Sequence, residues 1–267
     1  MYAKAKPHAI DDTVEHPLIV DGAHLSFGGL RALDGASFRV KPGIITGLIG
    51  PNGAGKTTMF NVISGLYRSD AGSITFMGHP IERLRPHQIT RLGLVRTFQI
   101  ARGFPKLSVF EHFMVYGAQQ PGEGIVTALT GSASARKREA QLAEKALSIA
   151  ARLRLSHALD NRVTDLSGGQ KKLLEIGRAL MAEPRMILFD EPAAGVNPTL
   201  AEEIGDHLLS LVADGMTVLL IEHDMALIER ICERVIVMAQ GRTLAEGSFD
   251  EVRENREVQD AYLGGRK

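Results

Sequence analysis

The sequence predicts an α/β fold in which a mostly parallel sheet forms the core and a mostly helical segment interrupts it. Short apolar strands alternate with helical stretches, a pattern typical of a parallel sheet covered on both faces. Residues 110–181 instead show a helical pattern. Apolar side chains recur there at helical spacing, at Leu142, Ala146, Ile149 and Leu153. A glycine-rich loop also joins an apolar strand to a helix, within residues 48–65.

The first half of the chain is rich in strands. The polar residues 1–16 have no sustained apolar core and are expected to form a tail. We expect strands at residues 17–27, 36–40, 44–50, 72–78 and 92–99, and a helix at residues 57–66. Loops are expected near residues 119–124 and 130–135, where glycine, proline and serine gather.

The second half returns to alternating strands and helices. We expect strands at residues 186–190 and 216–222, a helix at 198–215, a hairpin at 234–247 and a last helix at 248–263. The longest apolar runs are far shorter than the roughly 20 residues needed to cross a bilayer. If the protein acts at a membrane, another chain is therefore expected to supply the membrane part.

Composition excludes some classes of protein. The chain has 267 residues, of which 44% are hydrophobic and 23% charged, as in ordinary globular proteins. Lys+Arg and Asp+Glu both number 31, so the net charge gives no broad basic field for nucleic acid. The single cysteine, Cys232, cannot form an internal disulfide, which fits a reducing cytoplasm. Its apolar neighbours predict a buried, inert thiol.

Residues 50–57 match the phosphate-binding pattern G-x-x-x-x-G-K-[ST]. Glycines let successive backbone N–H groups point at phosphate oxygens, and the following helix adds its positive N-terminal end. Lys56 is expected to reach the β- and γ-phosphates of ATP, and Thr57 to offer its hydroxyl to Mg²⁺. The residues expected to contact the nucleotide are Asn52, Gly53, Ala54, Gly55, Lys56, Thr57 and Thr58.

Two carboxylates end the apolar strand at residues 186–190. Asp190 is expected to lie beside the glycine loop, where it can hold Mg²⁺. Glu191 follows it and is placed to polarise the water that attacks the γ-phosphate. The alternative is a polar strand end without chemistry.

A second glycine-rich helix start follows in the helical segment. Ser167, Gly168 and Gly169 precede a strongly apolar helix and form a second site of phosphate size. Alone, the pattern is also that of a plain N-cap with flexible glycines. One nucleotide rarely needs two separate cradles from one chain, so two chains arranged head to tail would use both.

Taken together, these motifs resemble the ATP-binding cassette (ABC) ATPases, and the match covers nearly everything after the tail. Lys56 and Thr57 stand at the Walker A positions, and Asp190 and Glu191 at Walker B. Residues 166–170 read "LSGGQ", the family signature, which adds Gln170 to the second nucleotide site.

The resemblance also implies roles for three residues that carry little signal alone. Gln99 matches the glutamine that links Mg²⁺ and the attacking water to the helical subdomain. His223 matches the histidine that contacts the γ-phosphate, and Phe27 matches the aromatic residue that stacks on adenine.

The implied fold is a P-loop (RecA-like) mostly parallel sheet core with an antiparallel β subdomain and an inserted α-helical subdomain. After a tail at residues 1–16, residues 17–267 are expected to form a single ABC ATPase domain. The expected divisions are a nucleotide-binding core at 17–98 and 184–247, a helical subdomain at 99–183 and a C-terminal helix at 248–267.

Within the family, five features narrow the choice. There is one cassette, and there is no long coiled-coil insertion. The motif "AAGVNP", with Asn197 where most of the superfamily has aspartate, is similar to importers of branched-chain amino acids. The C-terminal sequence and the extra loop at residues 119–136 are similar to the same group.

The resemblance therefore implies the ATP-hydrolysing subunit of an importer for branched-chain amino acids or related small polar solutes, at the cytoplasmic face of the inner membrane. Its expected partners are membrane-spanning permease subunits, a second ABC ATPase subunit and, indirectly, a periplasmic solute-binding protein. A heterodimer of cassettes is expected, with a homodimer as the alternative, and no nucleic acid is expected. The expected cofactors are ATP and Mg²⁺, and membrane docking is expected around Gln99 and residues 101–113.

Three alternatives remain at this point. A lipopolysaccharide-export ATPase has a similar size and chain ending. A soluble ABC ATPase acting on nucleic acid or ribosomes is a second class, against which the neutral net charge argues. A nucleotide-binding regulator without turnover is a third, and Glu191 and His223 argue against it.

Overall fold

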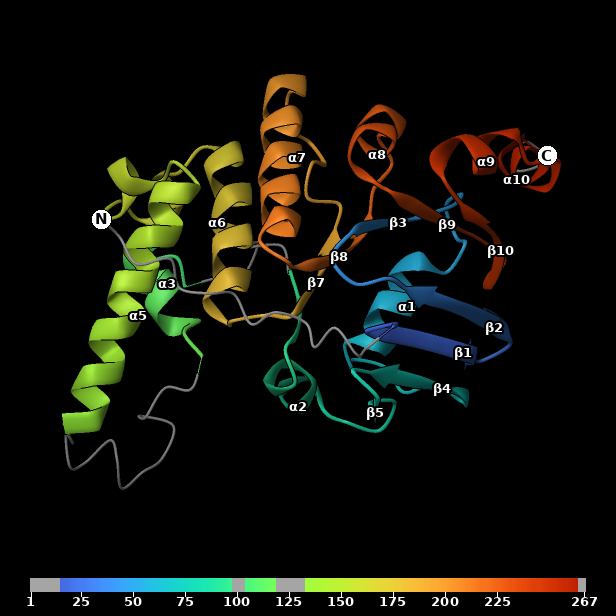
Figure 1. The fold of residues 1–267 in the computed structure, drawn as a ribbon, viewed down its shortest axis with the longest axis horizontal. Coiled ribbons are helices and arrows are strands. Elements are labelled where there is room, and N and C mark those ends of the chain that lie inside the picture. The colour runs from blue at the N-terminus through green and yellow to red at the C-terminus, as the bar shows by residue number, and fades with distance from the viewer. Residues whose placement is uncertain (1–14, 98–103, 119–132, 264–267) are drawn as a thin grey trace. The chain divides into compact units, whose positions relative to one another are not determined.

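The computed structural model describes residues 15–97, 104–118 and 133–263. The chain divides into two compact units (Figure 1), one formed by residues 1–96 with 185–267 and the other by residues 97–184. Gln99 and residues 119–132 lie outside the described residues, as does most of the tail at residues 1–16.

The first unit contains a mostly parallel sheet with strand order β10-β9-β3-β8-β7-β6. Its strands are β3 (Ile45–Ile49), β6 (Leu94–Arg96), β7 (Met186–Asp190), β8 (Thr217–Ile221), β9 (Arg234–Ala239) and β10 (Arg242–Gly247). Only the β9–β10 hairpin among these pairs is antiparallel. The three central strands, β3, β8 and β7, are buried almost throughout, as their continuous apolar sequences predict.

Register brings the carboxyl ends of the central strands together. Ile221 at the end of β8 pairs with both Leu48 in β3 and Asp190 in β7. The segments that follow β3, β7 and β8 therefore leave the sheet at one edge. Ligands of open α/β sheets bind at such an edge.

A second, antiparallel sheet in the same unit has the order β2-β1-β4-β5. Its strands are β1 (Leu18–Phe27), β2 (Leu30–Val40), β4 (Ala71–Phe76) and β5 (His79–Pro80). β2 begins six residues before the expected position 36, because a hairpin pairs Phe27 with Leu30 and Leu25 with Leu33. Pairing with the neighbouring strand decides this extension, since residues 30–35 have little strand character of their own.

Helices cover the parallel sheet. They are α1 (Lys56–Ile63), α2 (Pro86–Arg91), α7 (Pro198–Ala213), α8 (Met225–Ile231), α9 (Phe249–Glu254) and α10 (Arg256–Leu263). In Figure 1, α1 lies between the two sheets, and α7 and α8 lie on the other face of the parallel sheet. Met59 and Phe60 of α1 share one buried cluster with residues of both sheets. Burial of this cluster holds the start of α1 against the edge where β3 ends.

The expected single helix at residues 248–263 is wrong. Two helices form instead, α9 and α10, which are separated by Asn255 in an extended conformation with φ −72° and ψ 121°. The Asn255 side chain accepts hydrogen bonds from the backbone N–H groups of Glu257 and Val258, at 2.9 and 3.3 Å. It therefore caps the second helix, and this competes with continuing the first.

The second unit is helical, with α3 (Val109–Val115), α5 (Ala133–Arg152), η3 (Ser156–Ala158), η4 (Val163–Asp165) and α6 (Gly168–Met181). The expected apolar positions on α5 are buried: Leu142 3%, Ala146 0%, Ile149 7% and Leu153 1% exposed. A Cβ on Gly177 would lie 2.4 Å from the Phe113 ring, so this glycine lets α3 and α6 approach closely. α5 begins at Ala133, inside the expected loop at residues 130–135.

Neither unit contains, among the described residues, a helix that is both long and apolar enough to cross a bilayer.

Candidate functional site

The glycine-rich loop follows β3 and ends where α1 begins. Gly50, Gly53 and Gly55 have φ angles of 149°, 79° and 99°, a region that L side chains rarely adopt. A Cβ on Gly50 would lie 2.0 Å from the Met238 carbonyl oxygen, and one on Gly55 would lie 2.6 Å from that of Ala32. The loop is therefore a tight curl that β2 and β9 hold from behind, and such a curl suits a run of phosphate-facing N–H groups.

Lys56 is the first residue of α1, and it is 94% buried, with 6% of its surface exposed. Its ammonium donates to the carbonyl oxygens of Gly50 and Pro51, at 2.7 and 3.1 Å. Burial lowers the pKa of Lys56, and the nearby carboxylates of Glu191 and Asp190 oppose that shift. The two predicted Walker B carboxylates thus lie within electrostatic reach of the predicted phosphate-binding lysine.

Asp190 ends β7 and forms an ion pair that the sequence did not reveal. Arg96, the last residue of β6, donates from Nη2 to Asp190 Oδ2 at 2.7 Å. The same guanidinium donates from Nη1 to Asn61 Oδ1 of α1 at 2.6 Å. Arg96 therefore ties the ends of β6 and β7 to α1. Only the parallel pairing of β6 with β7 brings these residues together, so no local motif could have identified Arg96.

The oxygen groups suit a hard divalent cation. Thr57 stands exposed in the first turn of α1, and Asp190 lies at the neighbouring strand end. Hydroxyl and carboxylate oxygens are the ligands that Mg²⁺ prefers beside bound phosphates. Among the residues that the structure describes, no cluster of three or more His, Cys, Asp or Glu has the arrangement of an all-protein metal site.

Glu191 and His223 are in direct contact. The Glu191 carboxylate oxygen Oε1 lies 2.8 Å from His223 Nε2. Glu191 follows β7 and His223 lies just beyond β8, so the register of these two strands creates the contact. A carboxylate that an imidazole holds at the edge of the sheet where the glycine loop lies can accept a proton from water.

The predicted adenine-side residue is accessible. Phe27 ends β1 with 46% of its surface exposed. Tyr67 lies against it edge to face, with ring centroids 5.2 Å apart and an interplanar angle of 72°. Tyr67 is itself 44% exposed and was not singled out from the sequence. The pair forms a small aromatic surface of the kind that nucleobases stack on.

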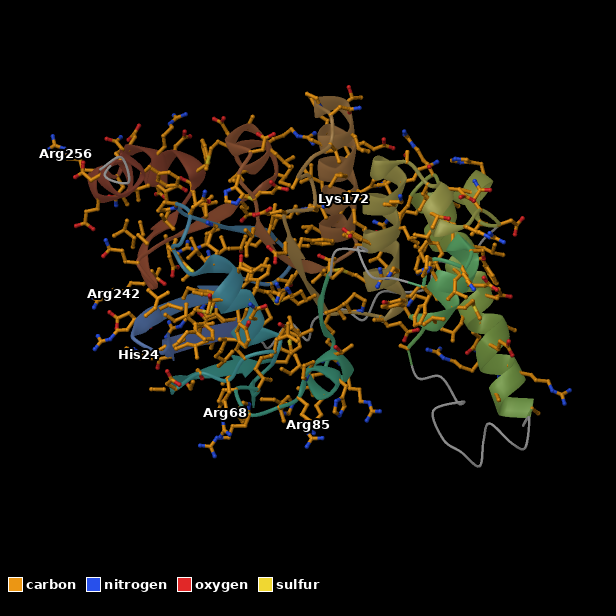
Figure 2. The ribbon with its side chains drawn as sticks, turned by 180° about the vertical axis from the view of Figure 1, so that it is seen from behind. His24, Arg68, Arg85, Lys172, Arg242 and Arg256 are labelled. Atoms are coloured by element: carbon orange, nitrogen blue, oxygen red, sulfur yellow. The ribbon has the colours of Figure 1, made fainter. Side chains whose placement is uncertain are left out.

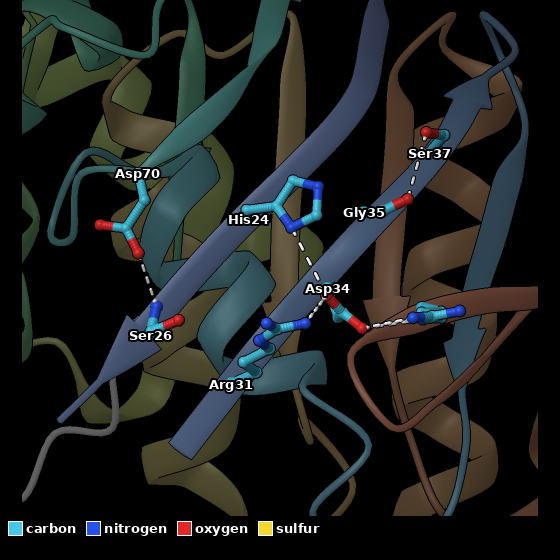
Figure 3. A network of polar contacts seen from close by, with 8 residues as sticks. His24, Ser26, Arg31, Asp34, Gly35, Ser37 and Asp70 are labelled. Carbon is cyan, nitrogen blue, oxygen red and sulfur yellow. Dashed lines mark hydrogen bonds and ion pairs between the residues drawn. The ribbon is translucent and has the colours of Figure 1, made fainter. Parts of the chain in front are cut away.

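A polar network fixes the strands behind the loop (Figure 3). Asp34 of β2 accepts from Arg242 Nε at 3.0 Å and lies 3.6 Å from His24 Nδ1. The hydrogen bond from Arg242 holds the pKa of Asp34 below its ordinary value. The Gly241 carbonyl accepts from the Asp34 N–H at 2.8 Å, and the Gly241 N–H donates to the Ala54 carbonyl at 3.0 Å. The network therefore reaches the glycine loop, and Figure 2 shows His24 and Arg242 on the same side of the unit.

The C-terminal helix also reaches the loop. Tyr262 of α10 shares a hydrogen bond with the backbone of Gly50, and burial raises the pKa of Tyr262 to about 12. Val258 on the same helix is 5% exposed, so apolar burial anchors α10. The helix α10 thus lies against the first glycine of the loop.

The signature residues belong to the second unit. Ser167 is the N-cap of α6, and its hydroxyl accepts from the Gln170 N–H at 3.2 Å. The Gln170 side chain accepts in return from the Ser167 N–H at 2.9 Å. The prediction that Ser167 is an N-cap is therefore confirmed. The Ser167 hydroxyl and the Gly168 backbone also remain exposed, which leaves them accessible to an anion.

The structure brings some of the predicted site residues together. Lys56, Thr57, Asp190, Glu191 and His223 lie at one edge of the parallel sheet in the first unit. Ser167, Gly168, Gly169 and Gln170 start a helix of the second unit, and Gln99 lies outside the described residues.

Comparisons with known proteins agree with this arrangement. Residues 33–194 match the ABC transporter family, and residues 242–267 match the family described as branched-chain amino acid ATP-binding cassette transporter.

Curated relatives are similar over most of the chain. The probable branched-chain amino acid transport ATP-binding protein LivG of Archaeoglobus fulgidus is 40% identical, over 89% of this chain and 91% of its own length. The high-affinity branched-chain amino acid transport ATP-binding protein LivG of Salmonella typhimurium is 38% identical, over 92% and 97%.

Solved structures with the same fold include a nucleotide-free ATP-binding cassette from an ABC transporter, with a TM-score of 0.80 and 38% identity, over 92% of this chain and 98% of that one. An ADP conformation of another such cassette has a TM-score of 0.81 and 37% identity, over 94% and 100%. This chain therefore belongs to the ABC transporter family, as an ATP-binding subunit in the group related to branched-chain amino acid transport.

Proposed function

We propose that this chain hydrolyses ATP to drive import of branched-chain amino acids or related small polar solutes through separate membrane subunits. The observation that carries the catalytic part is the 2.8 Å contact between Glu191 and His223, at the sheet edge that also holds Lys56 and Asp190. The similarity of the whole chain to transport ATP-binding proteins supports the transport part.

Each predicted site residue has a distinct role in this proposal. Lys56 neutralises the β- and γ-phosphates, and the loop N–H groups bind their oxygens. Glu191 accepts a proton from the attacking water, and His223 holds the Glu191 carboxylate and contacts the γ-phosphate. Phe27 stacks on the adenine, and Gln99 would carry the state of the site to the helical unit.

Mg²⁺ fits this set of residues. Thr57 would supply a hydroxyl ligand, and Asp190 a carboxylate that Arg96 already orients through one oxygen. The ion, when bound, would neutralise charge that develops on the phosphates.

The second site acts in trans in this proposal. The exposed start of α6 would bind the γ-phosphate of a nucleotide held by the loop of another cassette, so that ATP closes a head-to-tail pair. Hydrolysis and product release would reopen the pair, because ATP rather than apolar burial supplies most of its stability.

The proposed assembly contains membrane-spanning permease subunits, a second ABC ATPase subunit of a shorter type and, indirectly, a periplasmic solute-binding protein. The chain would act as a peripheral subunit at the cytoplasmic face of the inner membrane. We propose that residues 17–267 form one ABC ATPase domain, with the nucleotide-binding core at 17–98 and 184–247, the helical subdomain at 99–183 and the C-terminal segment at 248–267.

Glu191→Gln tests the catalytic proposal. The amide cannot accept the proton, so turnover should fall by about 10² or more while ATP affinity is kept. ATP should then trap the closed pair, which light scattering can detect. Glu229→Gln, at an exposed glutamate of α8, is the matched control and should change neither property. Near-normal hydrolysis in Glu191→Gln would remove Glu191 from its role.

Affinity purification tests the transport proposal. A tag on this chain, co-expressed with its neighbouring genes, should recover a membrane complex with two permease subunits and a second cassette. Two copies of this chain without a second cassette would contradict the heterodimer and favour the lipopolysaccharide-export type. Turnover stimulated by nucleic acid, without membrane partners, would favour a soluble ABC ATPase.

A further inference from the structure

We propose that Glu222 is a positioning residue of the hydrolysis site, whose buried carboxylate holds the turn carrying Glu191 in place against His223. The inference rests on the roles proposed above for Glu191 and His223. It concerns a residue that neither the glycine loop nor the Walker B pattern includes.

Glu222 follows the last residue of β8 and is 4% exposed. One carboxylate oxygen accepts the N–H of Ala193 at 2.7 Å, and the other accepts the N–H of His223 at 3.1 Å. Ala193 lies in the turn after β7, two residues beyond Glu191. A single carboxylate therefore bonds to both turns that bear the contacting pair.

The conformation of the Glu191 backbone shows why these hydrogen bonds to Glu222 are needed. Its φ of 52° lies in the left-handed region, which is unfavourable for a residue with a side chain. Two backbone hydrogen bonds hold this conformation: the Glu191 N–H donates to the Ile221 carbonyl at 2.9 Å, and its own carbonyl accepts from Ala194 at 3.1 Å. The bond from Ala193 to Glu222 is the third, and it is the only one of the three that depends on a side chain.

The carboxylate chemistry suits this position. Both groups that Glu222 contacts are backbone N–H donors, and an ionised carboxylate offers an acceptor to each. A glutamine of the same length would turn one N–H₂ group toward a donor. The charge also acts on the adjacent buried thiol, because the pKa of Cys232 is raised to about 12 by burial and, further, by Glu222. Burying a carboxylate costs desolvation free energy. A neutral side chain at position 222 would avoid this cost but would lose one of the two hydrogen bonds.

The test compares Glu222→Ala and Glu222→Gln with Thr217→Val. Thr217 is the matched control, because it starts the same strand, is 0% exposed and accepts the Gly43 N–H at 3.0 Å, remote from the site. ATPase activity is measured well below the melting temperature of each variant, with the folded fraction checked by circular dichroism.

The expected results separate positioning from stability. Glu222→Ala should lower kcat by about 10–10² with KM for ATP changed less than about threefold, since a small misplacement of the base costs about that much. Glu222→Gln should fall between the wild type and Glu222→Ala. Thr217→Val should lower the melting temperature and leave kcat unchanged.

A double variant provides a readout that a purely structural residue would not move. In Glu191→Gln, adding Glu222→Ala should lower kcat by less than twofold further, because the base that Glu222 positions is already gone. The proposal is overturned if Glu222→Ala keeps the wild-type kcat, or if the two changes multiply independently. Should Glu222→Ala fail to fold, Glu222→Gln answers the same two questions. Failure of the proposed function would look different, with Glu191→Gln itself retaining turnover.

Discussion

The glycine-rich starts of α1 and α6 look alike in sequence and differ in what the fold demands of them. Before α1, the backbone at Gly50 and Gly55 has positive φ angles, and a Cβ added at either glycine would collide with a neighbouring carbonyl oxygen. At the start of α6, Gly168 lies between Ser167 and Gln170, whose side chains form a capping box. Within the described part of the chain, a Cβ on Gly168 would meet no heavy atom within 4 Å.

The difference shows how to interpret a glycine beside a helix. Gly50 and Gly55 of the first loop are needed by their own chain, because a Cβ at either position would collide with the carbonyl groups of β9 or β2. The glycine at the start of α6 is not needed by its own unit, since the cap is complete without it. Its missing side chain instead leaves a bare backbone surface, and this favours a role toward a group outside the unit.

Alanine at each glycine gives the largest contrast. Gly55→Ala adds a Cβ 2.6 Å from the Ala32 carbonyl at a φ of 99°, so the free energy of unfolding should fall by about 2–5 kcal/mol. Gly168→Ala should change it by less than about 0.5 kcal/mol. Chemical denaturation of both variants measures these changes. Equal losses in the free energy of unfolding would contradict the claim that only the first loop needs its glycines for folding.

The effect of Gly168→Ala on ATPase activity tests whether the start of α6 acts on a nucleotide held by another chain. The added methyl group should lower steady-state ATPase turnover by about tenfold while nucleotide binding to the isolated chain stays normal, because only closure against another cassette meets it. Equilibrium binding of a fluorescent ATP analogue checks the second half of this statement. Weakened binding would show that the start of α6 acts within its own chain.

A smaller effect is expected at the ion pair that supports the first loop. Arg96 is 7% exposed at its side chain and Asp190 is 20% exposed. Arg96→Met leaves the Asp190 carboxylate without its cation, so the free energy of unfolding should fall by about 1–3 kcal/mol. The Mg²⁺ concentration for half-maximal ATP binding should also rise, which titration calorimetry can follow. An unchanged Mg²⁺ requirement would reduce Arg96 to a structural role.

The smallest effect is expected at the ion pair between the exposed Arg242 and the partly buried Asp34, behind the loop. Arg242 lowers the pKa of Asp34, so the pair stabilises the fold above the ordinary carboxyl pKa and loses this contribution as the pH falls through the folded-state pKa. Wild type should therefore exceed Arg242→Met in melting temperature slightly at neutral pH. The gap should close on acidification, and added salt should narrow it at neutral pH. A gap that widens with acid would contradict the assignment.

Local sequence predicted what depends on local pattern. The central strands were predictable because their apolar runs are buried on both faces, and α6 because its apolar face repeats at helical spacing. The division between α9 and α10 was missed, since it depends on the side chain of one residue, Asn255. The contacts of Arg96 and Glu222 could not be predicted, because strand order alone brings the ends of β6, β7 and β8 together.

The central claim is that the two helix starts serve one nucleotide from two different chains. Mixing Lys56→Ala with Ser167→Arg in the isolated chain tests it, under conditions where two copies of this chain pair in place of the second cassette and the wild type hydrolyses ATP. Each variant alone should be inactive, and a mixed pair carries both lesions at one site and neither at the other. The account predicts partial recovery of ATPase activity on mixing, up to about a quarter of the wild-type rate per chain if pairing is random. A Ser167→Arg variant that hydrolyses ATP at the wild-type rate, or a mixture that shows no recovery at any ratio, would contradict it.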